Sequence, residues 1–548
     1  MSRTWQYAAV FVIANGLSLC VPAEAAPQAA SSHLVDVGWL EKNLSNPAVV
    51  LLDASPAPLY AAQHIPGAVS VDLMAYGGQE RPVAEMEKLF QSWGVSPGKR
   101  IVLYDQGGTF LATRTLFDLY YRGVPAKDLA ILDGGLAKWQ EAKLPVTKDL
   151  PAAKIGTFKV RTLSEDVRVR LPEFLDASGD PAGHVLLEAL TGEWHFGEMA
   201  PFGRPGHPPY GVLVPSADFF NADKTFKSPD DLRRMLAYLT IGPEREVLTY
   251  CGGGVAASVP FFALKFLLGY PRVRLYAESE LGYLADERQL PYWTYDAPFL
   301  MRDAKWVQAW GGQMVRMYTP APVSIIDLRA ADVFGRGHLP FALNVPAETF
   351  SSNLATPEAL ARTLGAAGVN VAHEAVLISG AGITREAALA FVMLEKLGQK
   401  RVSILTDSME RAAQLGYAPT TAPTAVGPKT SARDLSIPPT AYPVSLRSGV
   451  IIADTGGAAG LYPKVFLASG SSLPEKPLEG KVVHVPYNSL LNADGTAKQA
   501  KEIWSLLTKA GVSRYAELVC VADDPGEAAV SYFILKLMGY PDVKMLVR

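Results

Sequence analysis

The sequence predicts an α/β protein of four consecutive units, each a mostly parallel sheet flanked by helices. The chain has 548 residues, more than one hydrophobic core usually serves, so several domains are expected. Apolar strand-like runs alternate with helix-like segments, which is the order of a parallel sheet covered on both faces. One spacing recurs four times: 18 residues separate a strand end from the glycine closing the next helix-like segment, at Asp105–Gly123, Cys251–Gly269, Gly380–Gly398 and Val521–Gly539.

The first unit is expected over residues 33–148. Its apolar run ends at Asp53, and the turn-like run His64-Ile65-Pro66-Gly67-Ala68 begins eleven residues later. Asp105 follows another strand-like run and precedes a helix-like segment. We interpret its side chain as capping that segment or accepting from loop N–H groups, rather than as a general base.

The second unit, expected over residues 155–297, contains the most informative run of the chain. A β-prone stretch stops at Cys251, three glycines follow, and a helix-compatible segment comes next. Such a loop presents backbone N–H groups and the positive end of a helix dipole, so we expect a lowered pKa and thiolate reactivity at Cys251. The predicted anion cradle consists of Gly252, Gly253, Gly254, Val255 and Ala256.

The third unit, expected over residues 303–418, repeats the landmarks of the first. The run Ser324-Ile325-Ile326 ends at Asp327, and His338 follows at the same interval of eleven residues. Gly380 takes the position of the cysteine, so this unit is expected to be inactive.

A Pro/Thr/Ala-rich stretch, residues 419–443, is expected to link the third unit to a degenerate fourth unit at residues 444–548. Val521 takes the position of the cysteine in this unit. Cys520 lies one residue earlier, and a one-residue gap would bring it into register, so its role stays open.

Several of these motifs resemble the rhodanese (sulfurtransferase) family. They are the Asp53 and His-Ile-Pro-Gly-Ala pair, the Tyr250-Cys251-x-x-Gly loop, and the run Leu-Asp-Gly-Gly-Leu-Ala-Lys-Trp at 132–139. The first two units together resemble a tandem thiosulfate or 3-mercaptopyruvate sulfurtransferase, whose first domain is inactive and whose second carries the cysteine. The resemblance is weakest in the fourth unit. It implies four rhodanese-like domains with one catalytic residue, Cys251.

The resemblance also implies a reaction. Sulfane sulfur would pass from thiosulfate or a similar donor to cyanide or a thiol, through a persulfide on Cys251. A buried, inert cysteine is the plain alternative, although three following glycines are unusual for simple packing. Phosphatase chemistry is disfavoured, because it needs an arginine six residues after the cysteine, where the chain has Ala257.

The donor stays open between thiosulfate and 3-mercaptopyruvate. In the family, basic loop residues suit thiosulfate and a Cys-Gly-Ser/Thr-Gly loop suits mercaptopyruvate, and this loop has neither. Glu188 stands in place of the usual aspartate. Arg204 is the nearest candidate cation for an anionic donor, with a solvated loop arginine as its alternative.

Composition excludes other classes. The net charge is −3, so no nucleic-acid partner is expected, and three cysteines are too few for a disulfide scaffold. His184, His195 and His207 lie near Glu193 and Glu198 but lack the spacing of a metal site. We therefore expect neither a metal nor a cofactor.

Residues 1–25 are expected to be a signal peptide. Arg3 precedes an apolar stretch at 7–19, and Ala23-Glu24-Ala25 offers a cleavage site. That stretch is too short to span a bilayer comfortably, so no transmembrane span is expected in the mature chain. A periplasmic or secreted protein with a free thiol suggests chemistry at that thiol.

Two further hypotheses stand beside the enzyme. Because three of the four units lack the nucleophile, the protein could be a non-catalytic periplasmic scaffold or sulfur carrier whose degenerate domains bind another protein. Alternatively, Cys251 and Cys520 could form a redox pair.

Overall fold

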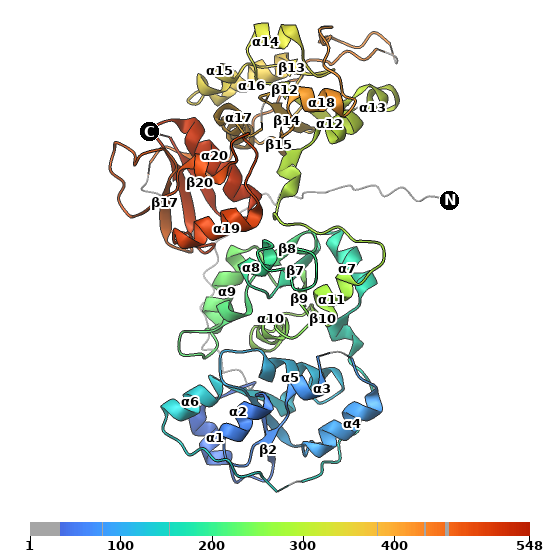
Figure 1. The fold of residues 1–548 in the computed structure, drawn as a ribbon, viewed down its shortest axis with the longest axis vertical. Coiled ribbons are helices and arrows are strands. Elements are labelled where there is room, and N and C mark those ends of the chain that lie inside the picture. Colours follow the sequence, from blue (N-terminus) through green and yellow to red (C-terminus); the bar gives the residue numbers. More distant parts are fainter. Residues whose placement is uncertain are drawn as a thin grey trace. The chain divides into compact units, whose positions relative to one another are not determined.

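The computed structural model describes residues 33–547, except 79, 153, 320, 381, 432–433 and 455–459. The expected signal peptide and Cys20 lie outside the described residues. The chain divides into two compact units, Met1–Trp293 and Thr294–Arg548, and each contains two five-stranded parallel sheets with helices on both sides (Figure 1). The predicted fold class is therefore confirmed.

The first sheet has the strand order β1-β5-β4-β2-β3. Its strands are β1 (Leu34–Val35), β2 (Val49–Asp53), β3 (Val69–Ser70), β4 (Arg100–Tyr104) and β5 (Leu129–Leu132). The helices around it are α1 (Val37–Asn43), α2 (Ala57–Ala62), α3 (Leu73–Tyr76), α4 (Val83–Ser92), α5 (Leu111–Tyr121) and α6 (Gly135–Glu141).

The second sheet repeats this order as β6-β10-β9-β7-β8. Its strands are β6 (Arg168–Val169), β7 (His184–Glu188), β8 (Gly211–Leu213), β9 (Glu246–Tyr250) and β10 (Val273–Tyr276). Its helices are α7 (Leu171–Ser178), α8 (Gly192–His195), α9 (Pro229–Tyr238), α10 (Ser258–Phe262), which continues into the π-helical turn η4 (Ala263–Leu267), and α11 (Ser279–Leu284).

The third and fourth sheets lie in the second compact unit and keep the same strand order. The third has β11 (Met301–Arg302), β12 (Val323–Asp327), β13 (Leu343–Asn344), β14 (Glu374–Ile378) and β15 (Arg401–Leu405), with α12 (Ala304–Gly311), α13 (Gln313–Tyr318), α14 (Ala331–Arg336), α15 (Ala347–Ser351), α16 (Pro357–Ala366), α17 (Arg385–Leu397) and α18 (Met409–Gln414). The fourth has β16 (Ile451–Ile452), β17 (Lys464–Ala468), β18 (Lys481–His484), β19 (Glu517–Val521) and β20 (Val543–Leu546), with α19 (Ala500–Lys509) and α20 (Pro525–Leu537).

Strand register aligns the four domains at the position that Cys251 occupies in the second. The central strand pairs end in register at Asp53↔Tyr104, Glu188↔Tyr250, Asp327↔Ile378 and Ala468↔Val521. The residue after each second partner is Asp105, Cys251, Ser379 or Ala522. The positions assigned by spacing to Gly380 and Val521 are therefore each wrong by one residue, because the segment from strand end to closing glycine differs in length between domains.

Cys520 lies inside strand β19 rather than in a loop. It is in register with Leu467 on one side and Met545 on the other, and it is fully buried. Burial raises the pKa of its thiol. Cys520 is thus part of the core of the fourth domain.

One turn occurs in the second domain of each compact unit and shows that the two units share a plan. The run Asn221-Ala222-Asp223-Lys224-Thr225 is matched by Asn492-Ala493-Asp494-Gly495-Thr496. In each turn the asparagine amide donates to the threonine Oγ1 and the threonine donates to the aspartate Oδ1. Each turn also touches the preceding domain: Phe226 N–H donates to the Asp133 carboxylate, and Ile383 N–H donates to the Gly495 carbonyl, both at 2.8 Å. Each unit is therefore a tandem pair built in the same way.

The proline-rich stretch after the third domain has no helix or named strand among its described residues. It packs on that domain: Thr420 pairs with His338, and the buried Tyr442 donates to the Gln399 side chain at 2.8 Å.

A search of the described residues finds no helix with the length and hydropathy needed to cross a bilayer.

Candidate functional site

Cys251 follows the last residue of strand β9, at the carboxyl edge of the second sheet. The backbone N–H groups of Gly253, Gly254, Ala256 and Ala257 donate hydrogen bonds to its sulfur. Gly254 has φ +76°, and a Cβ there would collide with the Ala277 carbonyl, so this bend in the loop requires glycine. The loop is thus a cradle of N–H donors around one sulfur atom.

The acidity of this cysteine differs from the prediction. Cys251 is only 2% exposed, and this burial raises the pKa of the thiol, with the four N–H groups acting in the opposite direction. The expectation of a lowered pKa is therefore wrong for the resting protein. The sequence shows the glycines but not the long-range packing that removes water from the sulfur.

Apolar side chains cover the outer face of the loop. A Cβ on Gly252 would stand 2.7 Å from the ring of Phe202 and 3.9 Å from Trp194, and one on Gly253 would stand 3.2 Å from Leu281. The rings of Trp194 and Phe202 also contact each other, with centroids 5.8 Å apart. These residues form the apolar cover of the cysteine.

Arg204, the candidate donor-binding cation, makes its described contacts away from the loop. Its Nη1 donates to the Leu290 carbonyl at 2.9 Å, and the guanidinium lies over the ring of Tyr292. Sequence reasoning missed Arg114, whose Nη1 donates to the Gly254 carbonyl at 2.9 Å from the first domain. The available signal was an arginine within the otherwise mostly uncharged segment of helix α5.

A buried polar group formed by Glu188, His195 and His207 lies beside Tyr250, the residue that precedes Cys251. Glu188 Oε2 accepts from His195 Nδ1 at 2.7 Å and from the Tyr250 hydroxyl at 2.9 Å. His207 Nδ1 donates to the His195 carbonyl at 2.9 Å, and the two imidazoles stack 3.6 Å apart. His184 lies elsewhere, beside Asp180 and Glu246.

Among the described residues, these three also form a group of possible metal ligands, because their ligand atoms lie within 4.8 Å of one another. However, the two rings are parallel to within 2°, so their nitrogen lone pairs run side by side instead of converging. The first and third domains contain the same stack with another aromatic ring in place of His195, Tyr60 on His64 and Phe334 on His338. The stack is a repeated structural feature, and its geometry does not fit a metal centre.

Glu280 lies at the start of helix α11, and its N–H donates to the Cys251 carbonyl. Desolvation and the charge of Glu188 raise the pKa of Glu280 to about 9. This carboxyl is therefore protonated at neutral pH, which keeps negative charge away from the neighbouring loop.

In the first domain, Asp105 occupies the position of the cysteine. Its carboxylate accepts from Gly107 N–H at 2.8 Å, Thr109 Oγ1 at 2.6 Å and Ala112 N–H at 3.0 Å. The interpretation of Asp105 as a fixed acceptor for loop N–H groups is confirmed.

The strand order, the four-fold repeat and the cysteine cradle define a multidomain α/β protein with a thiol at a strand end. Comparison with known proteins gives this class its family. The model of the rhodanese-like domain matches residues 36–142. A putative thiosulfate sulfurtransferase of Synechococcus elongatus is 30% identical over 310 residues, covering 52% of this chain and 93% of that protein. A probable 3-mercaptopyruvate sulfurtransferase of Pseudomonas aeruginosa is 31% identical over 280 residues, covering 47% and 97%.

Among solved structures, a 3-mercaptopyruvate sulfotransferase of Escherichia coli is 26% identical, covers 45% of this chain and 98% of that one, and has a TM-score of 0.40. The protein belongs to the rhodanese-like sulfurtransferase family.

Proposed function

We propose that the protein is an exported sulfurtransferase that carries sulfane sulfur as a persulfide on Cys251. The observation that supports this most directly is the set of four N–H donors around the Cys251 sulfur. Such donors stabilise a sulfur anion in a buried site. They suit the thiolate before transfer and the terminal sulfur of a persulfide after it.

With thiosulfate as donor, sulfur is transferred in two steps. The thiol loses its proton to solvent, and the thiolate attacks the outer sulfur of thiosulfate. The S–S bond of the donor breaks, sulfite leaves with its electron pair, and Cys251–S–S⁻ remains. Cyanide or a thiolate then attacks the outer sulfur, which releases thiocyanate or a new persulfide and restores the Cys251 thiolate. Because the resting pKa is raised, proton loss is a step that the bound donor or a higher pH must favour.

Mass spectrometry of the Cys251 peptide tests the proposal. The protein is incubated separately with thiosulfate, 3-mercaptopyruvate and polysulfide, and one added sulfur atom is expected on Cys251 with at least one donor. Cys251→Ser should show none on the same peptide, and Cys520→Ala should still form the adduct. Absence of the adduct with all three donors would overturn the proposal and favour the scaffold hypothesis.

A sulfur-carrier role is a second candidate. It is favoured by the buried position of Cys251 and by likeness to a sulfur carrier protein of Thermus thermophilus, 28% identical over 266 residues, covering 45% of this chain and 91% of that protein. A carrier would form the persulfide but release its sulfur to cyanide slowly and to a protein acceptor quickly. The two rates, measured on protein already loaded with sulfur, separate the candidates.

Export is tested by cell fractionation and by sequencing the N-terminus of the purified protein. A start near Ala26 in a periplasmic fraction is expected. The redox-pair hypothesis is tested by thiol counting, since both Cys251 and Cys520 are free thiols in this structure.

A further inference from the structure

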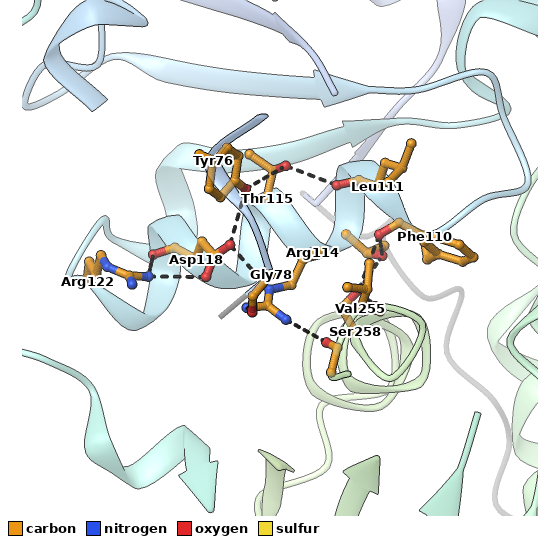
Figure 2. A network of polar contacts seen from close by, with 12 residues as sticks. Tyr76, Gly78, Phe110, Leu111, Arg114, Thr115, Asp118, Arg122, Val255 and Ser258 are labelled. Carbon is orange, nitrogen blue, oxygen red and sulfur yellow. Dashed lines mark hydrogen bonds and ion pairs between the residues drawn. The ribbon is translucent and has the colours of Figure 1, made fainter. Parts of the chain in front are cut away.

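Helix α5 of the first domain carries a buried arginine that reaches the cysteine loop of the second domain. Arg114 is 3% exposed; its Nη1 donates to the Gly254 carbonyl at 2.9 Å, and its Nη2 donates to the Gly78 carbonyl. Figure 2 shows this network from α5 to the loop. A guanidinium with this little exposure needs several acceptors, and here the loop itself supplies one of them.

The charges around Arg114 are few. Asp118 accepts from Arg114 Nε at 3.2 Å and from Arg122 Nη1 at 3.1 Å, and the Tyr76 hydroxyl donates to it at 3.2 Å. One carboxylate thus serves two guanidiniums. Arg122 has Glu80 as a second acidic neighbour.

The cysteine is a further ionisable neighbour of Arg114. Burial lowers the pKa of Arg114, whereas the charges of Asp118, Tyr76 and, last, Cys251 raise it. Such an interaction is mutual, so the guanidinium favours the thiolate of Cys251, while burial and the loop N–H groups act more strongly on the pKa of the thiol.

A second contact fixes the next peptide of the loop. The Ser258 hydroxyl donates to the Val255 carbonyl at 2.6 Å, and the Thr113 hydroxyl lies in a hydrogen bond 2.8 Å from Ser258 Oγ. The N–H of that same peptide, on Ala256, donates to the sulfur. Because the C=O and N–H of a trans peptide point in opposite directions, holding the carbonyl turns the N–H toward the sulfur.

We propose that Arg114 is a positioning residue for Cys251, so that the thiol-less first domain is a working part of the active site. Its guanidinium holds the Gly254 carbonyl and supplies the positive charge that favours an anionic sulfur. Stabilisation of a persulfide by Arg114 rests on the proposed function, whereas stabilisation of the Cys251 thiolate does not.

The test measures alkylation of Cys251 by iodoacetamide against pH, in a Cys520→Ala background. Arg114→Gln removes the charge and is expected to move the midpoint to higher pH. Arg114→Lys keeps a positive charge, so its alkylation midpoint should lie nearer that of the parent protein. Arg122→Gln is the matched control, because it also removes a guanidinium from Asp118 but does not reach the loop, and its midpoint should not move. The ratio kcat/KM for sulfur transfer at neutral pH should fall about 10- to 100-fold in Arg114→Gln.

An unchanged midpoint in folded Arg114→Gln, or an equal shift in Arg122→Gln, would overturn the proposal. If Arg114→Gln does not fold, the double variant Arg114→Met/Asp118→Asn removes the guanidinium together with its carboxylate partner, and a smaller shift of the midpoint to higher pH is required. Alkylation needs no sulfur donor, so the two proposals fail separately. If the alkylation midpoint shifts but no persulfide forms, only the proposed function is contradicted. If a persulfide forms but the midpoint does not shift, only the role of Arg114 is contradicted.

Discussion

The two tandem pairs share one architecture but join their domains differently. In the first pair, Phe117 of α5 packs edge-on against Phe261 of α10 with centroids 5.1 Å apart, and Thr113 and Ser258 share a hydrogen bond. Arg114 of α5 donates to the Gly254 carbonyl in the cysteine loop. In the second pair, α17 and α20 lie side by side, and Phe391 packs edge-on against Phe533 with centroids 5.0 Å apart (Figure 1). The two junctions therefore share an aromatic contact and differ in the arginine that crosses them. Arg114 is buried and donates to a backbone carbonyl of the cysteine loop, whereas Arg385 in the second pair is 45% exposed and pairs with the Asp524 carboxylate. The buried arginine occurs in the pair whose loop carries a thiol.

The strand-end position shows the same contrast. Glu188 in the second domain binds His195 and Tyr250, whereas its counterpart in the fourth domain is Ala468. A buried polar network is costly unless every member has a partner. The fourth domain has an alanine at this position and Ala522 at the position of Cys251 in the loop, whereas the first and third domains keep an aspartate here.

The largest expected effect separates the two buried cysteines. Cys251→Ser should lower sulfur transfer by at least about 1,000-fold, since the residue that forms the covalent intermediate is lost. Cys520→Ala should keep the activity and cost about 1 kcal/mol of stability through lost packing in the core. Steady-state rates and urea unfolding measure both, and a large loss of activity in Cys520→Ala would contradict the contrast between the pairs.

The second prediction concerns the aromatic contact between α17 and α20. Phe391→Ala should destabilise the second pair by about 3–5 kcal/mol, because Phe391 is 1% exposed and its partner Phe533 is fully buried. Hydrogen exchange read by mass spectrometry should show lost protection in peptides of α17 and α20. Tyr318→Ala, at a side chain that is 77% exposed, is the control and should change stability by less than about 0.5 kcal/mol.

The third prediction uses the raised pKa of Glu280. Its pKa is about 9 in the folded protein and 4.5 ordinarily, so the folded protein retains a proton that the unfolded chain releases. This group's contribution is fully present below about pH 4.5 and is lost as pH rises toward 9, by about 1.4 kcal/mol per pH unit. Glu280→Gln should therefore match the parent near pH 4 and be more stable at pH 8. Urea unfolding across this range decides, and parallel pH profiles would contradict the buried, protonated carboxyl.

The smallest expected effect comes from the hydrogen bond between Thr113 and Ser258. Thr113→Val should remove the hydrogen bond to Ser258 and cost about 0.5–1.5 kcal/mol in the first pair. A double-mutant cycle with Ser258→Ala isolates the coupling between the two hydroxyls. Additive effects of the two substitutions would show that the hydroxyls do not interact.

The fold could be predicted from sequence because its signals are local. Apolar runs such as 49–52 and the glycine-ended helices are visible within short windows, and their repetition identifies four copies. The exact register could not be predicted, because the loops after the central strands differ in length. By strand register, the residue equivalent to Cys251 is therefore Ser379 and not Gly380 in the third domain, and Ala522 and not Val521 in the fourth.

The cysteine loop could be predicted from the sequence, whereas the residues around it could not. Cys251 and its glycines are contiguous in sequence, so the cradle could be inferred from the residues. Phe202 and Leu281, which cover the loop, and Arg114, which lies behind it, are distant in sequence and come together only on folding. For the same reason the direction of the pKa shift of Cys251 could not be inferred from the loop alone.

The turn shared by residues 221–225 and 492–496 bears on how this chain arose. It is found in the second domain of each pair, and in both pairs it touches the domain before it. The second domain therefore corresponds to the fourth, and the first to the third, which indicates that a two-domain unit was duplicated.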